Sequence, residues 1–521
     1  MGFAAGGGYA RAMPDRSAGR DDGRYARLQA RLAPLFRTVF ADPRATRTVV
    51  VVPGLSMDQE LLSRIDGLQH YEERQLTMLM LLRLPNTRIV FVTSTPIDPV
   101  IIDYYLSLLP AIPHQQALRR LTLLSAYDGS SVSLTRKILD RPRLLARIRA
   151  AIGDPGVAHL SCFNATWDER ELALALDIPL YACDPALADL GGKSGSRELF
   201  RAAGVELAAG SEHLRDAGDV AAALARLRAE QPGLERAVVK LDQGASGEGN
   251  AVFRFDGAPE AGRGGVAPLE RWVRDRLPAQ LAFEAHGERW EHFCGKLAQM
   301  GGIAEAWIEG AGKRSPSAQL RILPTGRIEC ISTHDQLLGG TTGQRFLGST
   351  FPADPAYRLD IQQAAQRVGE QLLARGALGR FGVDFVSVPR ADGGWRNLAI
   401  EINLRKGGTT HTFQMLQYLT AGRYDAASGE FLTPAGERRC YYATDNLQRA
   451  AYRRLIPEDL VDVAVEQGLH FEQTDLCGVA FNLIGALSEF GKLGVVAIDG
   501  TLEAARARYA RTVAVLDAAT D

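Results

Sequence analysis

The sequence predicts a multidomain fold that combines α/β and α+β organisation. At 521 residues the chain is too long for one ordinary hydrophobic core, and this length suggests about three domains. Short β-branched runs alternate with helical stretches in the first third, whereas strand–turn–strand patterns follow later. We expect a flexible tail with a lead-in helix, a layered α/β domain, a larger central domain and a small C-terminal domain, at 1–45, 46–190, 191–433 and 434–521.

The α/β domain is predicted from apolar runs. "RTVVVVPGL" and "TRIVFVTS" are continuous hydrophobic runs, as expected for parallel strands that are buried on both faces. "LTLLSA", "AHLSCF" and "IPLYACD" continue this series between helix-like segments. The stretch from His70 to Pro110 is predicted to be mostly core helix, with Glu72, Glu73 and Arg74 on a solvated face or at a domain contact.

The second region opens with "GGKSGSRELFRAAGV", which contains the GKS of a phosphate-binding P-loop. A P-loop requires a glycine five positions before Gly192, but residue 187 is leucine, so this motif is excluded. We expect instead that Lys193 begins a short helix that ends at Gly204.

A glycine-rich loop follows a predicted strand in "ERAVVKLDQGASGEGNAVFRF". The strand ends at Lys240, glycines stand at 244, 247 and 249, and a returning strand is expected at 251–255. Such loops bring backbone N–H groups close to phosphates, and a nearby lysine adds a positive charge. An ordinary long hairpin has a similar sequence, so the loop gains significance from the motifs that follow it.

Polar and apolar side chains alternate in "LAIEINLRKGGTTH". In an extended strand Glu401, Asn403 and Arg405 share one face. The upstream segment "RFGVDFVSVPRADGGWRN" predicts a hairpin partner, and folding about residues 392–393 places Asp384 opposite Glu401. The resulting oxygen donors suit Mg²⁺, which proteins hold with one or two carboxylates plus nucleotide phosphates. The arginine can grip a phosphate or a carboxylate with two bonds.

Further strand patterns lie between the glycine loop and this hairpin. "IAEAWIEG" at 303–310 is an apolar strand suited to border an adenine ring. "SPSAQLRILPTGRIECISTHDQLLGG" predicts two strands joined by a Pro-Thr-Gly turn, and Ser317, Gln319 and Arg321 share a face of the first. A helix is expected from about 356 to 375.

Composition and charge exclude several classes of protein. Lys plus Arg number 60 and Asp plus Glu number 61, giving a formal charge of −1, so no nucleic-acid partner is expected. The six cysteines lie far apart without zinc-ligand spacing, which favours reduced thiols in a cytoplasmic protein. We expect no secretory or myristoylation signal in the N-terminal segment and a flexible tail over roughly the first 22 residues. No apolar run approaches the ~18 residues of a membrane span.

The order of these features resembles the ATP-grasp ligase superfamily. Lys193, the lysine and glycine loop at 240–250, "EAWIEG", Asp384 and the E-x-N-x-R motif follow one another in the order typical of that superfamily. The resemblance narrows to the ATP-grasp peptide ligases typified by the pheganomycin biosynthetic ligase, through "STHDQLLGG", "EINLRKGGTTH" and the stretch from about residue 437. It implies that the three ordered segments are a pre-ATP-grasp domain, an ATP-grasp domain and a small C-terminal domain.

The same resemblance implies roles for individual residues. ATP would be bound by side chains and backbone of the helix that begins at Lys193, the glycine loop and the strand of "EAWIEG". These residues are Lys193, Lys240, Gly244, Ser246, Gly247, Gly249, Glu305, Trp307, Ile308 and Glu309. The two lysines would contact the phosphates. Glu305 and the backbone around Trp307 and Ile308 would meet the adenine, and Glu309 would lie near the ribose. Mg²⁺, or Mn²⁺ as an alternative, would be held by Asp384, Glu401 and Asn403. Catalytic roles would belong to Arg405, facing the reacting carboxylate, and to Lys240 and Arg321.

The implied activity is that of an ATP-dependent carboxylate–amine (peptide) ligase. It would form an acyl phosphate and then an amide, releasing ADP and phosphate. Small-molecule carboxylate and amine substrates are expected, with no nucleic-acid or membrane partner and with a homodimer left open. An ATP-grasp phosphotransferase and a non-catalytic ATP-binding protein are the alternatives; a biotin-type carboxylase is disfavoured, because no lysine flanked by methionines is present for biotin attachment. His334 and His411 are candidate bases for the amine, although a lone histidine is commonly structural.

Overall fold

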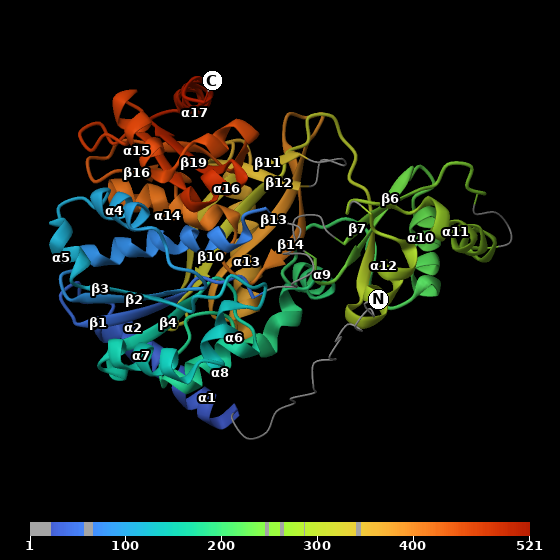
Figure 1. Ribbon diagram of the computed structural model, residues 1–521. Helices are drawn as coiled ribbons and strands as arrows, with labels where there is room; N and C mark the ends of the chain where they lie inside the picture. The colour runs from blue at the N-terminus through green and yellow to red at the C-terminus, as the bar shows by residue number, and fades with distance from the viewer. Residues whose placement is uncertain are drawn as a thin grey trace, which may run out of the picture.

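The computed structural model describes residues 22–56, 66–244, 249–260, 265–285, 287–339 and 345–520. These residues form sheets of four, five and eight strands and one small two-stranded sheet. Figure 1 shows the five-stranded sheet and its helices as a lobe beside the rest of the molecule, with α9 (Lys193–Ala202) at the junction. The expected mixture of parallel α/β and antiparallel organisation is confirmed.

The N-terminal sheet is parallel and has the strand order β3-β2-β1-β4. Its strands are β1 (Arg47–Val52), β2 (Thr87–Thr93), β3 (Leu121–Ser125) and β4 (Ala158–Cys162). Every residue of β1 and β4 is buried, as continuous apolar runs predict. The helices of this region are α1 (Asp22–Gln29), α2 (Leu32–Thr38), α4 (Pro99–Ser107), α5 (His114–Leu118), α6 (Leu134–Leu139), α7 (Pro142–Ile152), η2 (Pro155–Val157) and α8 (Trp167–Leu176).

The last strand predicted for this region, in "IPLYACD" at 178–184, does not form. Within these described residues Leu180 alone is paired, in an isolated parallel bridge with Leu160. Pro179 has no N–H group to donate, and the turn η3 (Pro185–Gly191) begins directly afterwards, so the ladder cannot extend.

The stretch at 70–110 that was predicted to be mostly core helix also contains β2 and α4. Its first part lies in η1 (Leu68–Arg83), a 3₁₀ helix. Its Glu73 and Arg74 are buried. Arg74 forms an ion pair with Asp445, and the backbone N–H of Gly485 donates to Glu73 at 3.2 Å. These two charged residues therefore form a contact with the C-terminal region, which was one of the two expectations.

The five-stranded sheet has the order β5-β9-β6-β7-β8, and each pair of neighbouring strands in it is antiparallel. Its strands and helices are β5 (Gly210–Leu214), α10 (Ala217–Glu230), β6 (Arg236–Leu241), β7 (Asn250–Arg254), α11 (Ala267–Gln280), β8 (Ala282–Phe283), α12 (Trp290–Met300) and β9 (Gly302–Ala306). The strands predicted on both sides of the glycine loop are confirmed. The strand predicted at 303–310 is shorter than expected, because β9 ends at Ala306.

The eight-stranded sheet has the order β14-β13-β10-β11-β12-β17-β19-β18 and is antiparallel. Its strands are β10 (Pro316–Ile322), β11 (Ile328–Gly339), β12 (Arg345–Phe351), β13 (Gly379–Pro389), β14 (Trp395–Asn403), β17 (Cys440–Gln448), β18 (Gly478–Asn482) and β19 (Lys492–Asp499). The sheet thus continues across position 434, where a small C-terminal domain was expected to begin. One hydrophobic core cluster joins side chains of η1, α4 and α14 to those of β17, β18 and β19.

The remaining elements complete this part of the chain. They are α13 (Arg358–Ala374), α14 (Gly408–Thr420), β15 (Arg423–Asp425), β16 (Glu430–Leu432), η4 (Ala450–Arg454), α15 (Pro457–Glu466), η5 (Ile484–Ala486), α16 (Leu487–Phe490) and α17 (Leu502–Ala518). The helix predicted at about 356 to 375 is α13. Among the described residues, no helix is long and apolar enough to cross a membrane.

The β13–β14 hairpin has the register that positions the candidate site. Asp384 pairs with Glu401, as predicted, but the route to this register differs from a symmetric hairpin. Near the turn Pro389 pairs with Trp395, which centres the turn on Asp392 alone. A bulge between Asp384 and Phe385 then shifts the pairing by one residue. The bulge therefore places the two carboxylates side by side.

Candidate active site

Two carboxylates face each other on neighbouring strands at the centre of the site. Asp384 and Glu401 are cross-strand partners, so their side chains lie on the same face of the sheet. The Asn403 amide nitrogen donates to Asp384 Oδ2 at 3.0 Å and to Glu401 Oε1 at 3.3 Å. Gln336 on β11 donates its Nε2 to Asp384 Oδ1 at 2.8 Å. The three predicted metal ligands are thus brought together, with a glutamine as an additional neighbour.

The carboxylate pair has an uneven electrostatic environment. Burial and the charge of Glu401 raise the pKa of Asp384 to about 7. Burial also opposes ionisation of Glu401, but the charges of Lys193 and Lys240 outweigh it and hold its pKa below the usual value. Two adjacent, half-buried carboxylates repel each other unless a cation or a proton lies between them, and a divalent metal ion meets that requirement.

The donor set fits magnesium better than zinc. Among the described residues there is no group of three or more His, Cys, Asp and Glu side chains arranged to hold a metal. Two carboxylates and one amide are all oxygen donors when the amide oxygen turns to the metal. Such a partial set matches Mg²⁺, which takes its remaining ligands from phosphates and water.

Lys193 links the two sheets that border the site. It is the first residue of α9, as predicted, and its Nζ lies 3.2 Å from Glu401 Oε2 and 3.4 Å from the Gly244 carbonyl oxygen. The helix start is held in place because the Ser194 N–H and hydroxyl both donate to Asp242 Oδ1 at 2.8 Å. Lys193 thereby reaches both the carboxylate pair and the beginning of the glycine loop.

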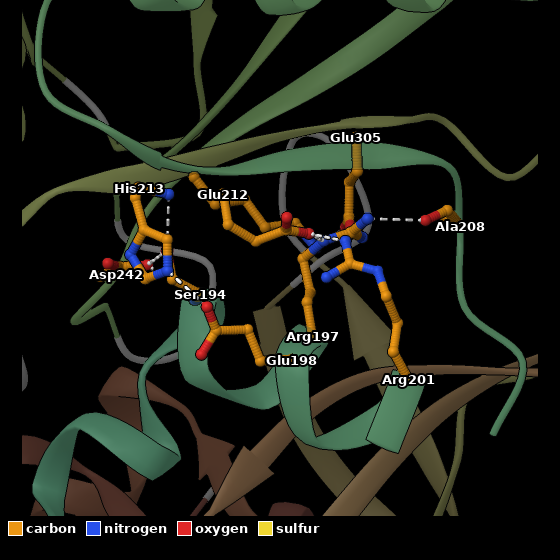
Figure 2. A network of polar contacts seen from close by, with 10 residues as sticks. Ser194, Arg197, Glu198, Arg201, Ala208, Glu212, His213, Asp242 and Glu305 are labelled. Carbon is orange, nitrogen blue, oxygen red and sulfur yellow. Dashed lines mark hydrogen bonds and ion pairs between the residues drawn. The ribbon is translucent and has the colours of Figure 1, made fainter. Parts of the chain in front are cut away.

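Lys240 belongs to a buried network of charges between α9 and the five-stranded sheet, and Figure 2 shows Arg197, Glu212 and Glu305 of this network. Its ammonium group pairs with Glu305, whose other oxygen accepts from Arg197 Nη1 at 2.8 Å. Arg197 also donates to the Ala208 carbonyl oxygen at 2.9 Å and pairs with Glu212. The Glu305 carboxylate is therefore occupied by two cations of the protein.

The residues predicted to meet the base and the ribose lie just beyond β9. Arg236 forms a two-point ion pair with Glu309, at 2.7 and 2.9 Å, and its guanidinium lies 4.7 Å from the centre of the Trp307 ring. Lys313 donates to the Ile308 carbonyl oxygen at 3.2 Å. These residues border the five-stranded sheet, and no hydrogen bond or ion pair among the described residues joins them to Asp384 or Glu401, as expected if base and phosphates bind at different ends of one nucleotide.

The glycine loop is described only at its ends. The backbone N–H of Leu241 donates to the Gly249 carbonyl oxygen at 3.0 Å, and Gly249 has a φ of 84°, a left-handed conformation that favours glycine. Gly244 accepts from Lys193, as above. Ser246 and Gly247, predicted to contact phosphates, lie outside the described residues.

The two predicted catalytic arginines have different positions. β14 ends at Asn403, so the strand alternation does not extend to Arg405, contrary to the expectation. Arg405 nevertheless remains beside the pair: burial lowers its pKa, and the charges of Glu401 and Asp384 oppose that shift. Arg321 lies further along β10 and bonds Glu329 through Nε at 3.2 Å. The structure therefore brings Arg405, and not Arg321, to the carboxylate pair.

Comparisons with known proteins agree with this arrangement. A family model described as "IQCH-like, ATP-grasp" matches residues 272–427, and one described as "PGM1 C-terminal domain" matches 459–512. An L-propargylglycine–L-glutamate ligase of Streptantibioticus cattleyicolor is 32% identical over 89% of this chain and 92% of its own length. The chain belongs to the ATP-grasp ligase family. Its members of this type join a carboxylate to an amine.

Two more distant similarities accompany this match. IQ motif-containing protein H of Danio rerio is 23% identical over 75% of this chain, which spans 41% of that protein. A crystal structure of an ADP complex of N5-carboxyaminoimidazole ribonucleotide synthetase is 12% identical, with a TM-score of 0.49 over 91% of this chain and 98% of the other.

Sequence reasoning missed two neighbours of the site in this ATP-grasp ligase. Gln336 was not selected, although two-residue alternation from His334 on the predicted strand would have placed it on the site face. Lys406 follows Arg405 directly, and its ammonium group donates to Gln75 Oε1 at 2.6 Å and Ser161 Oγ at 3.0 Å. Burial lowers the pKa of Lys406 to about 7. Its partners come from a different region of the chain, so no local pattern could reveal them.

The two candidate bases are buried. Burial lowers the pKa of both His334 and His411 to about 3, so each ring is neutral near pH 7 and accepts protons poorly. His334 Nε2 lies 2.7 Å from the Tyr441 hydroxyl, and both rings pack in the aromatic cluster around Phe351. This environment favours a structural role for His334.

Proposed function

We propose that this ATP-grasp ligase activates a substrate carboxylate as an acyl phosphate and joins it to the amine of a second substrate, both being amino acids or short peptides. The observation that carries the proposal is the pair of Asp384 and Glu401 with the Lys193 ammonium 3.2 Å from one of its oxygens. A pair of carboxylates beside a lysine suits a site for the metal and phosphates of ATP. The amino-acid class is supported by the relative that is named for ligating L-propargylglycine and L-glutamate.

The residues of the carboxylate pair would hold the metal and orient the phosphates. Asp384, Glu401 and the amide oxygen of Asn403 are its ligands, with Mg²⁺ as the expected ion and Mn²⁺ as the alternative. When bound there, the ion would neutralise phosphate charge. Lys193 and Lys240 supply two further positive charges on the side of the five-stranded sheet.

Both lysines must change partners when ATP binds. In the structure Lys193 neutralises Glu401 and Lys240 neutralises Glu305. The phosphates carry more negative charge than one carboxylate, so each lysine ammonium would interact more strongly with the phosphates than with its present partner. The metal ion would then neutralise Glu401 in place of Lys193. Arg197 keeps Glu305 paired during this exchange, since it holds the other carboxylate oxygen.

The nucleotide base would lie beyond the end of β9. Both oxygens of the Glu305 carboxylate are already paired, so the adenine would bond to the backbone around Trp307 and Ile308. Glu309 is half-exposed and bonded to Arg236, so a ribose hydroxyl group can approach it from solvent. The ends of the glycine loop, Gly244 and Gly249, would bring backbone N–H groups to the phosphates.

The reaction has two displacement steps. A carboxylate oxygen attacks the γ-phosphorus of ATP, the bond from that phosphorus to the β,γ-bridging oxygen breaks, and ADP leaves. The amine nitrogen attacks the acyl carbon, the bond from that carbon to the phosphate oxygen breaks, and the amine loses a proton. Amide, ADP and phosphate are the products, and no residue of the protein is covalently modified.

Arg405 would stabilise charge in both steps. It follows the metal-binding strand, and its guanidinium interacts electrostatically with Asp384 and Glu401. A planar guanidinium can bond two oxygens of the carboxylate at once and then the oxyanion that forms when the amine attacks. Positioning and charge stabilisation are the main contributions that a phosphoryl-transfer site of this kind requires.

A screen of paired substrates tests the proposal. Pools of amino acids as acids and amines are incubated with Mg-ATP, and ADP, phosphate and new amides are measured by mass spectrometry. We expect ADP release that requires both partners and equals the amide formed. ADP release with a phosphorylated product and no amide would indicate a phosphotransferase instead, and nucleotide binding without turnover across the pools would indicate a non-catalytic ATP-binding protein.

A further inference from the structure

A second group of positive charges lies on the same sheet face as the carboxylate pair. Residues 380, 382 and 384 of β13 alternate onto one face, so Arg380 lies on the side that Asp384 occupies, about 13 Å away along the strand. Arg380 is the direct cross-strand partner of Arg321 on β10. Like charges at directly opposed positions destabilise a sheet unless an anion lies between them.

The N-terminal domain closes over this end of β13. A Cβ added to Gly379 would lie 3.1 Å from the Ala182 Cα, so the strand start touches the backbone next to Tyr181. The charges of Arg321 and Arg380 both act on the Tyr181 hydroxyl, and the charge of Arg380 also acts on the Lys406 ammonium. Arg380, Arg321, Tyr181 and Lys406 therefore form one cluster, which we term the arginine cluster.

The positive charge of the arginine cluster is only partly balanced. One anion, Glu329, forms ion pairs with Arg321 and Arg327, and its charge also acts on Arg380 and Tyr181. Lys406 bonds to two neutral side-chain oxygens. No hydrogen bond or ion pair joins the Arg380 guanidinium to any of the residues that the structure describes, and burial with the nearby charge of Arg321 lowers its pKa to about 10.

An unpaired hydroxyl group belongs to the same cluster as the unpaired guanidinium. The Tyr181 oxygen is buried and has no hydrogen-bond partner among the described residues. Buried polar groups are normally bonded, because each one left without a partner costs free energy. A cationic fork and a hydroxyl donor together match one planar anion, and a carboxylate has that shape.

We propose that the arginine cluster binds a second anionic group of the acid substrate, so that the enzyme prefers a dicarboxylate, such as an acidic amino acid, over its neutral amide. This assignment rests on the proposed function. One carboxylate of the substrate reacts beside Arg405, and the other is held by Arg380, Arg321 and the Tyr181 hydroxyl. Lys406 adds positive charge at the border between the two positions.

Direct binding tests the assignment without requiring turnover. L-Glutamate and L-glutamine, which have nearly the same shape but differ in charge, are titrated into the protein with Mg²⁺ and a non-hydrolysable ATP analogue. The wild type should bind glutamate about tenfold more tightly or better, as expected of a charge-assisted hydrogen bond. The variant Arg380→Gln should lose this preference, whereas Arg390→Gln, at an exposed arginine after the same strand, should keep it.

Three results would overturn the assignment. They are equal or absent binding of the two amino acids by the wild type, a glutamate preference that persists in Arg380→Gln, and a loss of nucleotide-analogue affinity in that variant, which would make Arg380 a phosphate ligand. Failure of the proposed function is separate, since it would appear as absent amide formation in the substrate screen while these binding constants remain measurable.

Thermal stability distinguishes binding from a structural role. Arg380→Gln removes a charge that lacks a partner, so the melting temperature without substrate should stay unchanged or rise. Added glutamate should then raise the melting temperature of the wild type and of Arg390→Gln but not that of Arg380→Gln. A large fall in the melting temperature of substrate-free Arg380→Gln would show that the arginine supports the fold and would contradict the assignment.

Discussion

Lys193 Nζ lies 3.2 Å from Glu401 Oε2, which joins the first residue of α9 to the last strand of the β13–β14 hairpin. One group belongs to a helix and the other to the eight-stranded sheet, and both face the proposed phosphate site. In the structure the lysine neutralises the carboxylate. Binding of a metal ion and ATP would give each of them a new partner of opposite charge.

Mg-ATP should stabilise the protein through these contacts. A ligand that binds only the folded state adds about 2.7 kcal/mol of stability at 100 times its Kd, so the melting temperature should rise with Mg-ATP concentration. Lys193→Met should reduce this rise strongly, because it removes a phosphate contact. The exposed Arg147→Gln serves as control. An equal rise in wild type and Lys193→Met would remove the lysine from the phosphate site.

Each carboxylate of the pair should be essential for turnover. Glu401→Gln and Asp384→Asn remove charge with little change of volume, so we expect losses of orders of magnitude in kcat with the fold intact. Without substrate, the melting temperature should hold or rise in Asp384→Asn, because repulsion between the two carboxylates is removed. It should fall modestly in Glu401→Gln, because Lys193 loses its ion-pair partner. Asp392→Asn in the exposed turn of the same hairpin is the matched control. Near-normal activity in both site variants would rule out the metal assignment.

Arg405→Lys should separate nucleotide binding from acyl transfer. Lysine keeps the charge but loses the two-point grip, so ATP affinity should remain nearly normal while kcat falls on the order of 10²-fold. Nucleotide titration and amide formation are measured on the same preparation. A variant with weakened ATP affinity and unchanged kcat would show that Arg405 is a phosphate ligand. Arg321 would then be the next candidate to contact the reacting carboxylate.

Lys406 should make the free energy of unfolding depend on pH between about 7 and 10.5. Burial lowers its pKa to about 7 in the folded protein, against 10.5 for an ordinary lysine, so between these values the unfolded chain binds more protons than the folded chain. Its contribution to the free energy of unfolding should therefore rise with pH by up to about 1.4 kcal/mol per unit in this window. Melting temperatures of wild type and Lys406→Met, compared at pH 7 and pH 9 under reducing conditions, should diverge in favour of the wild type. A constant difference would contradict the lowered pKa.

Local patterns in the sequence predicted those parts of the site that lie on one hairpin or one helix. Strand alternation placed Asp384, Glu401 and Asn403 together, and the helix start placed Lys193. The prediction could not include the bulge after Asp384, because a bulge depends on how two strands pack and not on either strand alone. The strand expected at 178–184 fails for a local reason, its proline.

Contacts between distant segments were beyond such patterns. Glu305 was expected to meet the adenine, and no local pattern predicted that its carboxylate is paired with Lys240 and Arg197, residues far from it in sequence. Arg380 stands in an ordinary β-strand pattern, which does not distinguish it from other polar residues on strands. Its significance arises from Arg321 on the neighbouring strand and from Tyr181 of the N-terminal domain, which only the folded chain brings together.

The transfer of a single oxygen atom tests the proposed acyl phosphate most directly. An acid substrate found in the screen is labelled with ¹⁸O in its carboxyl groups and converted with unlabelled Mg-ATP, an amine and unlabelled water. If the carboxylate attacks the γ-phosphorus, each amide formed leaves one ¹⁸O atom in the released phosphate, as read by mass spectrometry. Amide formation that yields phosphate without ¹⁸O would contradict the acyl phosphate route and, with it, the roles assigned to Asp384, Glu401 and Arg405.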